Sequence, residues 1–212
     1  MTLAKLPDSA AAGLAIAQPT QAGRRAAAYV LADAFQDDPI FEWCIPDAER
    51  RAAILPDAFA AFVDSVAHHN ETYLATAGVQ SIGATLGAPA DVEPLTPDAE
   101  EALIARLAQL IGPGPDLDRL FQVMELLGDH HPSADAYYLW FIGVVADAQG
   151  RGVGSQLLAQ ITDRCDAAGT AAYLEATTPG NRALYERHGF VVLEEISVAD
   201  SPSLWPMWRA PR

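Results

Sequence analysis

The chain contains little positive charge. Lys and Arg number 13 together, Lys5 is the single lysine, and 28 Asp and Glu residues give a formal net charge of −15. Binding to nucleic acid phosphates or to an anionic membrane depends on clustered basic residues, so neither partner is expected. The acidic balance favours a cationic partner instead.

Cysteines are also scarce. The two that are present, Cys44 and Cys165, cannot build a disulfide framework. Cys165 shares a helical face with Leu158 and Ile161, which predicts a buried side chain and not a reactive thiol.

Long apolar runs are missing as well. No stretch approaches the roughly 20 residues that a membrane span needs, and Pro7 and Asp8 make residues 1–18 a poor signal peptide. We therefore expect a cytoplasmic protein. Half of the 212 residues are hydrophobic and no repeat or low-complexity linker divides them, so residues 1–212 are predicted to form a single domain.

Periodicity before residue 130 predicts mostly helices. We expect a strand in 13–20, helices in 22–35 and 48–69, a hairpin over 72–88, and helices in 95–112 and 116–129. Pro39 and Pro46 interrupt the helical pattern after the first helix, and Pro56 should kink or split the second one. Gly78 is expected at the hairpin turn.

The pattern changes after a loop at 128–135. A nearly continuous apolar strand is predicted over 136–145, followed by a helix at 152–168, a strand at 171–177, a helix at 181–189, a strand at 190–198 and a terminal segment at 204–210. A strand, a crossover helix and a strand with two antiparallel elements after them predict a mixed α/β sheet.

The segment 149–158, QGRGVGSQLL, places three alternating glycines just before a helical pattern. Gly150, Gly152 and Gly154 would let the backbone approach a ligand closely, and the helix would present free N–H groups at its positive end. Such a loop suits an anion, with a phosphate as the first expectation. A tight turn between strand and helix, with no ligand, is the simpler alternative.

Two common phosphate loops fit this segment poorly. A dinucleotide-binding turn needs G-x-G-x-x-G and an acidic residue roughly 20 positions on, where Glu175 stands. The spacing here is G-x-G-x-G followed by Ser155, and the chain has one strand-helix-strand unit instead of two. A Walker loop is excluded because no Gly-Lys-Ser/Thr follows.

The pattern Q-x-x-G-x-G at 149–154 resembles the loop of the GNAT superfamily of N-acetyltransferases. Residues 137–190 resemble the cofactor half of that family in the order of their features: the strand LWFIGVV, the loop, SQLL on a helix, and YLEATTPGNRALYERHGF. The resemblance extends more thinly to LADAFQDDPIFEWCIPD and PSLWPMWRAP, which are similar to the subgroup containing puromycin N-acetyltransferase.

This resemblance implies an α/β (α+β) fold of the GNAT type: a mixed, mostly antiparallel twisted sheet with helices on both faces and a splayed parallel strand pair at the acetyl-CoA site. An acceptor-side half of about 14–130 would precede an acetyl-CoA-binding half of about 136–212. Acetyl-CoA would be the cosubstrate, and no metal is expected. The residues implied to bind acetyl-CoA are Ile142, Gly143, Val144, Gln149, Gly150, Arg151, Gly152, Val153, Gly154, Ser155 and Asn181.

Two residues are implied to be catalytic. Tyr185 falls where the family often places a tyrosine facing the thioester sulfur, and its hydroxyl would donate a proton to the departing thiolate. Glu175, at the end of its strand, is the first candidate for the base that takes a proton from the amine. A core position for Tyr185, a structural role for Glu175, and His130 or His131 in the acceptor pocket remain alternatives.

The sequence therefore predicts an N-acetyltransferase that moves an acetyl group directly from acetyl-CoA to a small, cationic amine within a ternary complex. A nicotinamide-dependent oxidoreductase and a non-catalytic sensor of acetyl-CoA are the alternatives. A monomer or a homodimer is expected.

Overall fold

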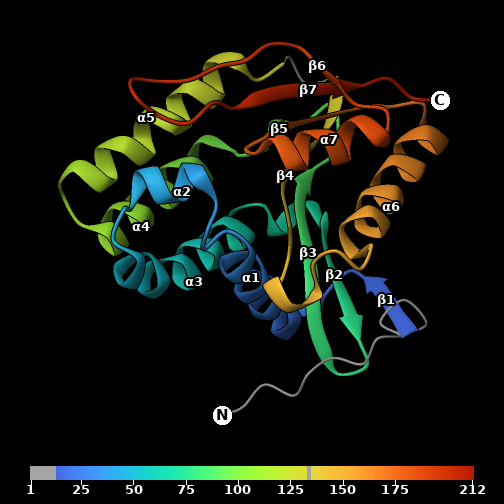
Figure 1. The fold of residues 1–212 in the computed structure, drawn as a ribbon, viewed down its shortest axis with the longest axis horizontal. Helices are drawn as coiled ribbons and strands as arrows, with labels where there is room; N and C mark the ends of the chain where they lie inside the picture. Colours follow the sequence, from blue (N-terminus) through green and yellow to red (C-terminus); the bar gives the residue numbers. More distant parts are fainter. Residues whose placement is uncertain (1–12, 133–134) are drawn as a thin grey trace.

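The computed structural model describes residues 13–132 and 135–212 and is built around one seven-stranded sheet (Figure 1). All neighbouring strands are antiparallel except the central pair β4 and β5. Across the sheet the strands are β1 (Leu14–Ala17), β2 (Thr72–Ala77), β3 (Gln80–Ala88), β4 (Ala136–Val144), β5 (Ala171–Ala176), β7 (Trp205–Arg209) and β6 (Val191–Val192). This arrangement confirms the predicted mixed, mostly antiparallel sheet.

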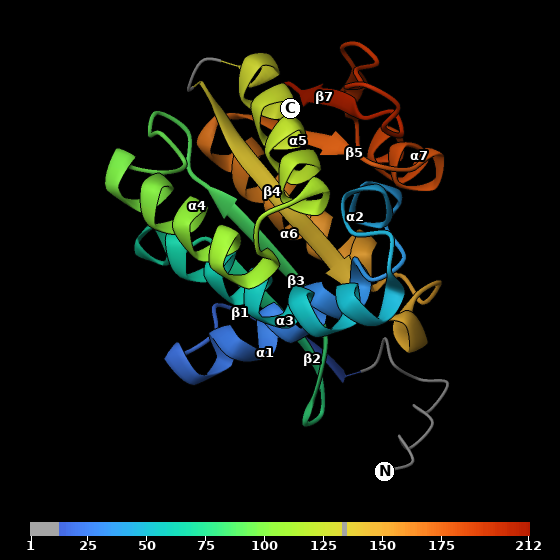
Figure 2. The ribbon, with the colours of Figure 1, turned by 90° about the vertical axis from the view of Figure 1, so that its left-hand side faces the viewer.

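Helices cover both faces of the sheet. In chain order they are α1 (Gln21–Ala34), α2 (Pro39–Cys44), α3 (Ala48–Ser65), α4 (Pro97–Ile111), α5 (Pro115–His130), α6 (Val153–Ala168) and α7 (Pro179–Arg187). Figure 2 shows α1, α3, α4 and α5 on one side of β4 and α6 on the other. No helix in the described ranges has the length and apolar character needed to cross a membrane.

The core follows the predicted periodicity. The larger cluster joins α1 to α5 with one face of β3, and a second cluster packs α6 against β4 and β5. Cys165 lies in the second cluster beside Leu158 and Ile161, and Cys44 is buried in the first. The prediction that Cys165 is a core residue is therefore confirmed.

Pro56 does not split the second helix. Helix α3 runs unbroken through Pro56, although proline removes one backbone hydrogen bond. The neighbours Leu55, Ala58 and Phe59 are buried, and their packing outweighs that loss. The helical pattern is interrupted before Pro39 as predicted: α1 ends at Ala34, and Pro39 is the first residue of α2, where its missing N–H costs nothing.

Two boundaries also differ. Helix α5 continues past Gly128 to His130, so the predicted loop is shorter at its start. The predicted strand over 190–198 is reduced to β6 and one bridge between Ile196 and Leu204. Gly78, in contrast, turns the hairpin of β2 and β3 as predicted, with φ of 61°.

Strands β4 and β5 pair over only three residues, which end at the pair Tyr138 and Tyr173. Beyond that point β5 pairs with β7 on its other side, while β4 continues to Val144 without a partner on the β5 side. The parallel pair therefore opens like a V. This is the predicted splayed pair, and it leaves room inside the sheet.

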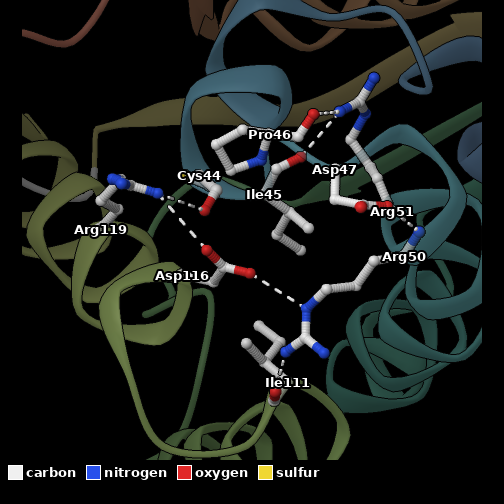
Figure 3. A network of polar contacts seen from close by, with 9 residues as sticks. All are labelled: Cys44, Ile45, Pro46, Asp47, Arg50, Arg51, Ile111, Asp116 and Arg119. Carbon is white, nitrogen blue, oxygen red and sulfur yellow. Dashed lines mark hydrogen bonds and ion pairs between the residues drawn. The ribbon is translucent and has the colours of Figure 1, made fainter.

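A buried arginine closes the turn between α2 and α3 (Figure 3). Arg51 is 3% exposed, and its guanidinium donates hydrogen bonds to the carbonyl oxygens of Gln36 and Ile45, both at 2.7 Å, and of Pro46 at 3.3 Å. Glu42 lies 3.6 Å from the same group and balances its charge. One side chain thus satisfies carbonyl groups on both sides of α2.

Asp116, at the start of α5, joins the same region from below (Figure 3). Its carboxylate accepts hydrogen bonds from Arg50 of α3 at 3.0 Å and from Arg119 at 3.4 Å. Arg119 also donates to the Cys44 carbonyl at the end of α2. These contacts hold α2, α3 and α5 together as one wall.

Replacing Arg51 with methionine should destabilise this wall. The buried Ile45 carbonyl and the part-buried carbonyls of Gln36 and Pro46 would lose their donor, and we expect the free energy of unfolding to fall by about 2–4 kcal/mol. Urea denaturation followed by circular dichroism measures the change. Arg106→Met, at an exposed position of α4, is the control and should change the free energy of unfolding by less than about 0.5 kcal/mol. Equal effects of the two variants would contradict the structural role of Arg51.

Candidate active site

The glycine loop adopts a conformation that two of its glycines make possible. Gly150 and Gly152 have φ of 72° and 82°, in the left-handed region that other residues avoid. Gly154 lies in the first turn of α6, and a Cβ there would meet Val144 and Leu184 at 3.6 and 3.8 Å. The first two glycines therefore shape the loop, and the third keeps the space between β4 and α7 open.

The loop ends at the free N-terminus of α6. Helix α6 begins at Val153, its cap residue Gly152 supplies no side-chain acceptor, and the first backbone bond runs from the Gln156 amide to the Gly152 carbonyl. The amides of Val153, Gly154 and Ser155 are left for a ligand at the positive end of the helix. This geometry suits a pyrophosphate.

A cleft, here called the loop cleft, follows from this loop along the end of β4 to α7. The predicted cofactor residues that line it are Ile142, Gly143, Val144, Gln149, Gly150, Gly152, Val153, Gly154, Ser155 and Asn181. Arg151 is the member of the predicted set that does not line it. The structure thus brings ten of the eleven residues to one cleft, where Tyr185 and Arg187 also lie.

Several of these residues also hold the cleft in shape. The Gln149 side chain donates to the Val144 carbonyl at 3.1 Å and fastens the loop to the end of β4. The Ser155 hydroxyl lies 2.6 Å from Nε2 of His188 and joins α6 to the end of α7. At Gly143, a Cβ would come within 2.6 Å of Ala34, so glycine allows α1 to approach β4.

A second space, here called the inner cavity, lies between the opened strands and the helices α2 and α5. It shares Phe35, Asp38, Ile142, Asn181 and Tyr185 with the loop cleft, so the two spaces meet at these side chains. The rest of its lining is mainly aromatic and aliphatic. A ligand in the loop cleft and a ligand in the inner cavity would touch at this junction.

Glu175 lines the inner cavity from β5. Its Oε2 accepts a hydrogen bond from the Tyr138 hydroxyl at 3.1 Å, and its buried Oε1 has no partner in the described part of the chain. Burial raises the pKa of Glu175 to about 7, and the hydroxyls of Tyr173 and Tyr138 oppose a further rise. A carboxyl group with a pKa near neutrality and one free oxygen suits a general base.

Asp38 is a second carboxylate at the junction, and the sequence analysis missed it. It is 7% exposed and caps α2 by accepting a hydrogen bond from the Ile40 amide at 2.9 Å, while its other oxygen accepts one from the Thr177 hydroxyl. Burial raises the pKa of Asp38, although these hydrogen bonds lower it in part. The sequence Asp-Pro at 38–39 indicates a helix start, but nothing local shows that this helix begins beside β5.

Tyr185, on α7, lines the inner cavity together with the two carboxylates. It is 5% exposed and lines both the loop cleft and the inner cavity. Burial raises its pKa, and the negative charges of Asp38 and Glu175 raise it further, so the hydroxyl stays protonated at neutral pH. Tyr185 can therefore donate a proton and cannot act as a base under these conditions.

The predicted histidine alternatives are placed elsewhere. His131 lies in an outer cleft lined also by Glu93, Glu100, Met124 and Trp140, and its ring packs on Tyr138 at 4.4 Å between centroids. Neither His130 nor His131 lines the inner cavity. Within 13–132 and 135–212, no group of three or more His, Cys, Asp or Glu residues is arranged to hold a metal ion.

Part of the chain matches a known family. Residues 121–192, less than half of the chain, match the model of the acetyltransferase (GNAT) domain. This confirms the predicted acetyltransferase class and the resemblance at the family level, and the matched segment spans β4, the glycine loop, α6, β5 and α7.

Individual proteins are similar to the chain as well. An uncharacterized N-acetyltransferase of Schizosaccharomyces pombe is 38% identical over 61 residues, which are 29% of this chain and 25% of that protein. The solved structure of histone acetyltransferase HPA2 and related acetyltransferase from Corynebacterium glutamicum is 27% identical with a TM-score of 0.72, covering 94% of this chain and 97% of that one. A mosquito arylalkylamine N-acetyltransferase like 5b shares the fold at 14% identity and a TM-score of 0.59, over 93% and 100% of the two chains.

The fold also speaks against the oxidoreductase alternative. A dinucleotide-binding domain needs an open, mostly parallel sheet made of two similar halves. The sheet here contains a single parallel pair among the described strands. The GNAT family uses acetyl-CoA as cosubstrate, and the loop cleft has the anion-binding amides that such a ligand needs.

The contact of Tyr138 with Glu175 predicts a pH shift. A base must be ionised to act, so kcat/KM should fall as the pH drops below about 7. Tyr138→Phe removes a donor to the ionised carboxylate, which raises the pKa of Glu175 and should move this acidic limb upward by about 1 pH unit. Rates of thiol release between pH 5.5 and 9 measure the shift, with two amines of different pKa to separate the titration of the acceptor.

Tyr137→Phe is the matched control. Tyr137 is the neighbouring residue on β4, and its buried hydroxyl has no hydrogen-bond partner in the described ranges. We expect an unchanged pH profile for this variant. A Tyr138→Phe profile that overlays the wild type would contradict the role of Glu175 as the base.

Proposed function

We propose that the protein is an acetyl-CoA-dependent N-acetyltransferase that transfers the acetyl group directly to a small-molecule amine in a ternary complex. The observation that carries this proposal is the junction of the two spaces at Asp38, Asn181 and Tyr185, within reach of Glu175. Acetyl-CoA in the loop cleft would place its thioester at this junction. The amine would approach from the inner cavity.

The proposed reaction moves protons at two atoms, the amine nitrogen and the departing sulfur. An amine arrives as an ammonium, and Glu175 accepts the first of the two protons that the nitrogen loses, which frees the lone pair to attack the thioester carbonyl. The bond between carbon and sulfur then breaks as the Tyr185 hydroxyl donates a proton to the thiolate of CoA, and the second proton from the nitrogen restores the Tyr185 hydroxyl. Glu175 passes its proton to solvent, and the products are the N-acetylated amine and free CoA.

The amides of Val153, Gly154 and Ser155 would hold the pyrophosphate, and Gly150 and Gly152 would allow its close approach. The end of β4 has no strand partner on the β5 side and can pair through its backbone with the pantetheine arm. Asn181 would contact the same arm from α7. Arg187, the basic residue that lines the loop cleft, adds positive charge for a CoA phosphate.

A small amine is supported by the place of the inner cavity between the opened strands and helices α2 and α5, and by the carboxylates Asp38 and Glu175, which favour a cation. The mosquito protein named an arylalkylamine N-acetyltransferase has the same fold, and the resemblance to the puromycin N-acetyltransferase subgroup also favours a small acceptor. We propose that residues 1–212 form a single acetyltransferase domain with an acceptor-side half and a cofactor half. The sensor alternative would leave the paired acid and base without a role.

Tyr185→Phe tests the proposed reaction. The substitution removes one hydroxyl and keeps the ring, so kcat should fall by about 10²–10⁴ while the KM for acetyl-CoA changes little. Thiol release in the presence of acetyl-CoA and amine measures both constants. Tyr137→Phe, which also removes a buried hydroxyl, should retain wild-type turnover.

Two results would contradict this assignment. Unchanged turnover of Tyr185→Phe would show that the thiolate receives its proton from another group. A large drop in melting temperature with little loss of kcat would show that Tyr185 is a core residue whose hydroxyl serves the fold.

A further inference from the structure

The walls of the inner cavity contain more aromatic rings than proton transfer requires. A bulge in β4 explains part of this: Leu86 of β3 faces Phe141, but its neighbour Gly87 faces Leu139, so Trp140 has no partner on β3. Trp140 and Phe141 therefore line the same cavity although they are consecutive in the strand, and their rings stack 5.4 Å apart at 24°.

Aromatic rings on the helices complete this lining of the inner cavity. Phe62 of α3 packs edge-on against Trp140 with centroids 5.2 Å apart, and Phe35 packs edge-on against Phe141 at 5.4 Å. Phe41 of α2 contacts Phe35 at 5.7 Å. These contacts lock the rings in place, so the cavity presents a rigid aromatic surface and loses little entropy when a flat apolar group enters.

Charge divides the inner cavity into two ends. Asp38 lies at the end shared with the loop cleft, Glu175 lines the cavity from β5, and no Lys or Arg among the described residues lines it. The opposite end is bounded by Met124 and Leu127 of α5 and by Trp140, which also line the outer cleft. Glu93 and Glu100 lie in the outer cleft beyond these side chains, so a second charge would reach a carboxylate only by passing this apolar end of the cavity.

This polarity matches a molecule with one ammonium and an apolar ring. On the basis of the proposed function, we infer that the acceptor is a primary amine joined by a short chain to an aromatic ring. The ammonium lies near Asp38 and Glu175, and the ring lies against Trp140 and Phe141. Met124, between the inner cavity and the outer cleft, limits the length of the ring-bearing group.

The first test compares acceptors that share a primary amine. Thiol release at saturating acetyl-CoA gives kcat/KM for 2-phenylethylamine, ethylamine and the diamine putrescine. Burial of the phenyl ring should raise kcat/KM for 2-phenylethylamine about 10- to 100-fold above ethylamine, and putrescine should react more slowly than 2-phenylethylamine. Putrescine as the best acceptor, or equal values for 2-phenylethylamine and ethylamine, would overturn the inference.

A size variant tests where the ring lies. Met124→Trp fills the apolar end of the cavity and should lower the ratio of kcat/KM for 2-phenylethylamine to that for ethylamine at least tenfold. Gln122→Trp, at an exposed position of the same helix, is the control and should leave the ratio unchanged. An unchanged ratio in Met124→Trp, with the variant folded by circular dichroism, would place the ring elsewhere and overturn the inference.

Calorimetry separates this inference from the proposed function. Titration of 2-phenylethylamine into the protein saturated with CoA reports binding to the cavity without turnover. Binding that Met124→Trp weakens, together with no thiol release from any amine, would retain the aromatic site and contradict the acetyltransferase proposal. Acetylation of polar amines with no binding of 2-phenylethylamine would retain the acetyltransferase proposal and contradict the aromatic site.

Discussion

The separation of β4 from β5 after three residue pairs is the constraint on which the candidate site depends. If the two strands stayed paired to their ends, no gap would open between them. Neither the inner cavity nor the loop cleft would then reach the centre of the sheet. The opening leaves the end of β4 free for a ligand on one side and lets Glu175 face an enclosed space on the other. Antiparallel pairing of β5 with β7 keeps β5 in place while it departs from β4.

The opening alone would expose Glu175 to water, so the chemistry depends equally on the helices that close it. The wall of α2 and α5 excludes solvent, and this exclusion raises the pKa of Glu175 to about 7. Arg51 and Asp116 hold that wall, although neither touches the cavity. Contacts that stabilise the fold far from the junction therefore contribute to the ionisation of Glu175.

Local signals in the sequence predicted much of the cofactor side. The loop needs glycine at 150 and 152 because the backbone has positive φ there. Pro56 could not be judged locally, because the packing of α3 decides whether a proline breaks it. The strand predicted over 190–198 was too long, since only β6 and one bridge pair there and edge pairing depends on neighbours distant in sequence.

The acceptor side was hidden for a different reason. Asp38 lies 139 residues before Thr177, its hydrogen-bond partner, and only the folded chain brings them together. The aromatic lining of the inner cavity depends on a bulge that breaks the alternation of side chains in β4. Periodicity alone would assign Trp140 and Phe141 to opposite faces. Non-local packing therefore determines which acceptor the site would take, whereas the cofactor loop is a local motif.

The central claim is that both substrates meet at the junction of the loop cleft and the inner cavity and react there directly. Initial rates measured while 2-phenylethylamine is varied at several fixed acetyl-CoA concentrations test it. Reciprocal plots that intersect are expected, because both substrates must be bound before the acetyl group moves. Parallel lines would show that the acetyl group passes first to the protein and that CoA leaves before the amine binds, which would contradict the account.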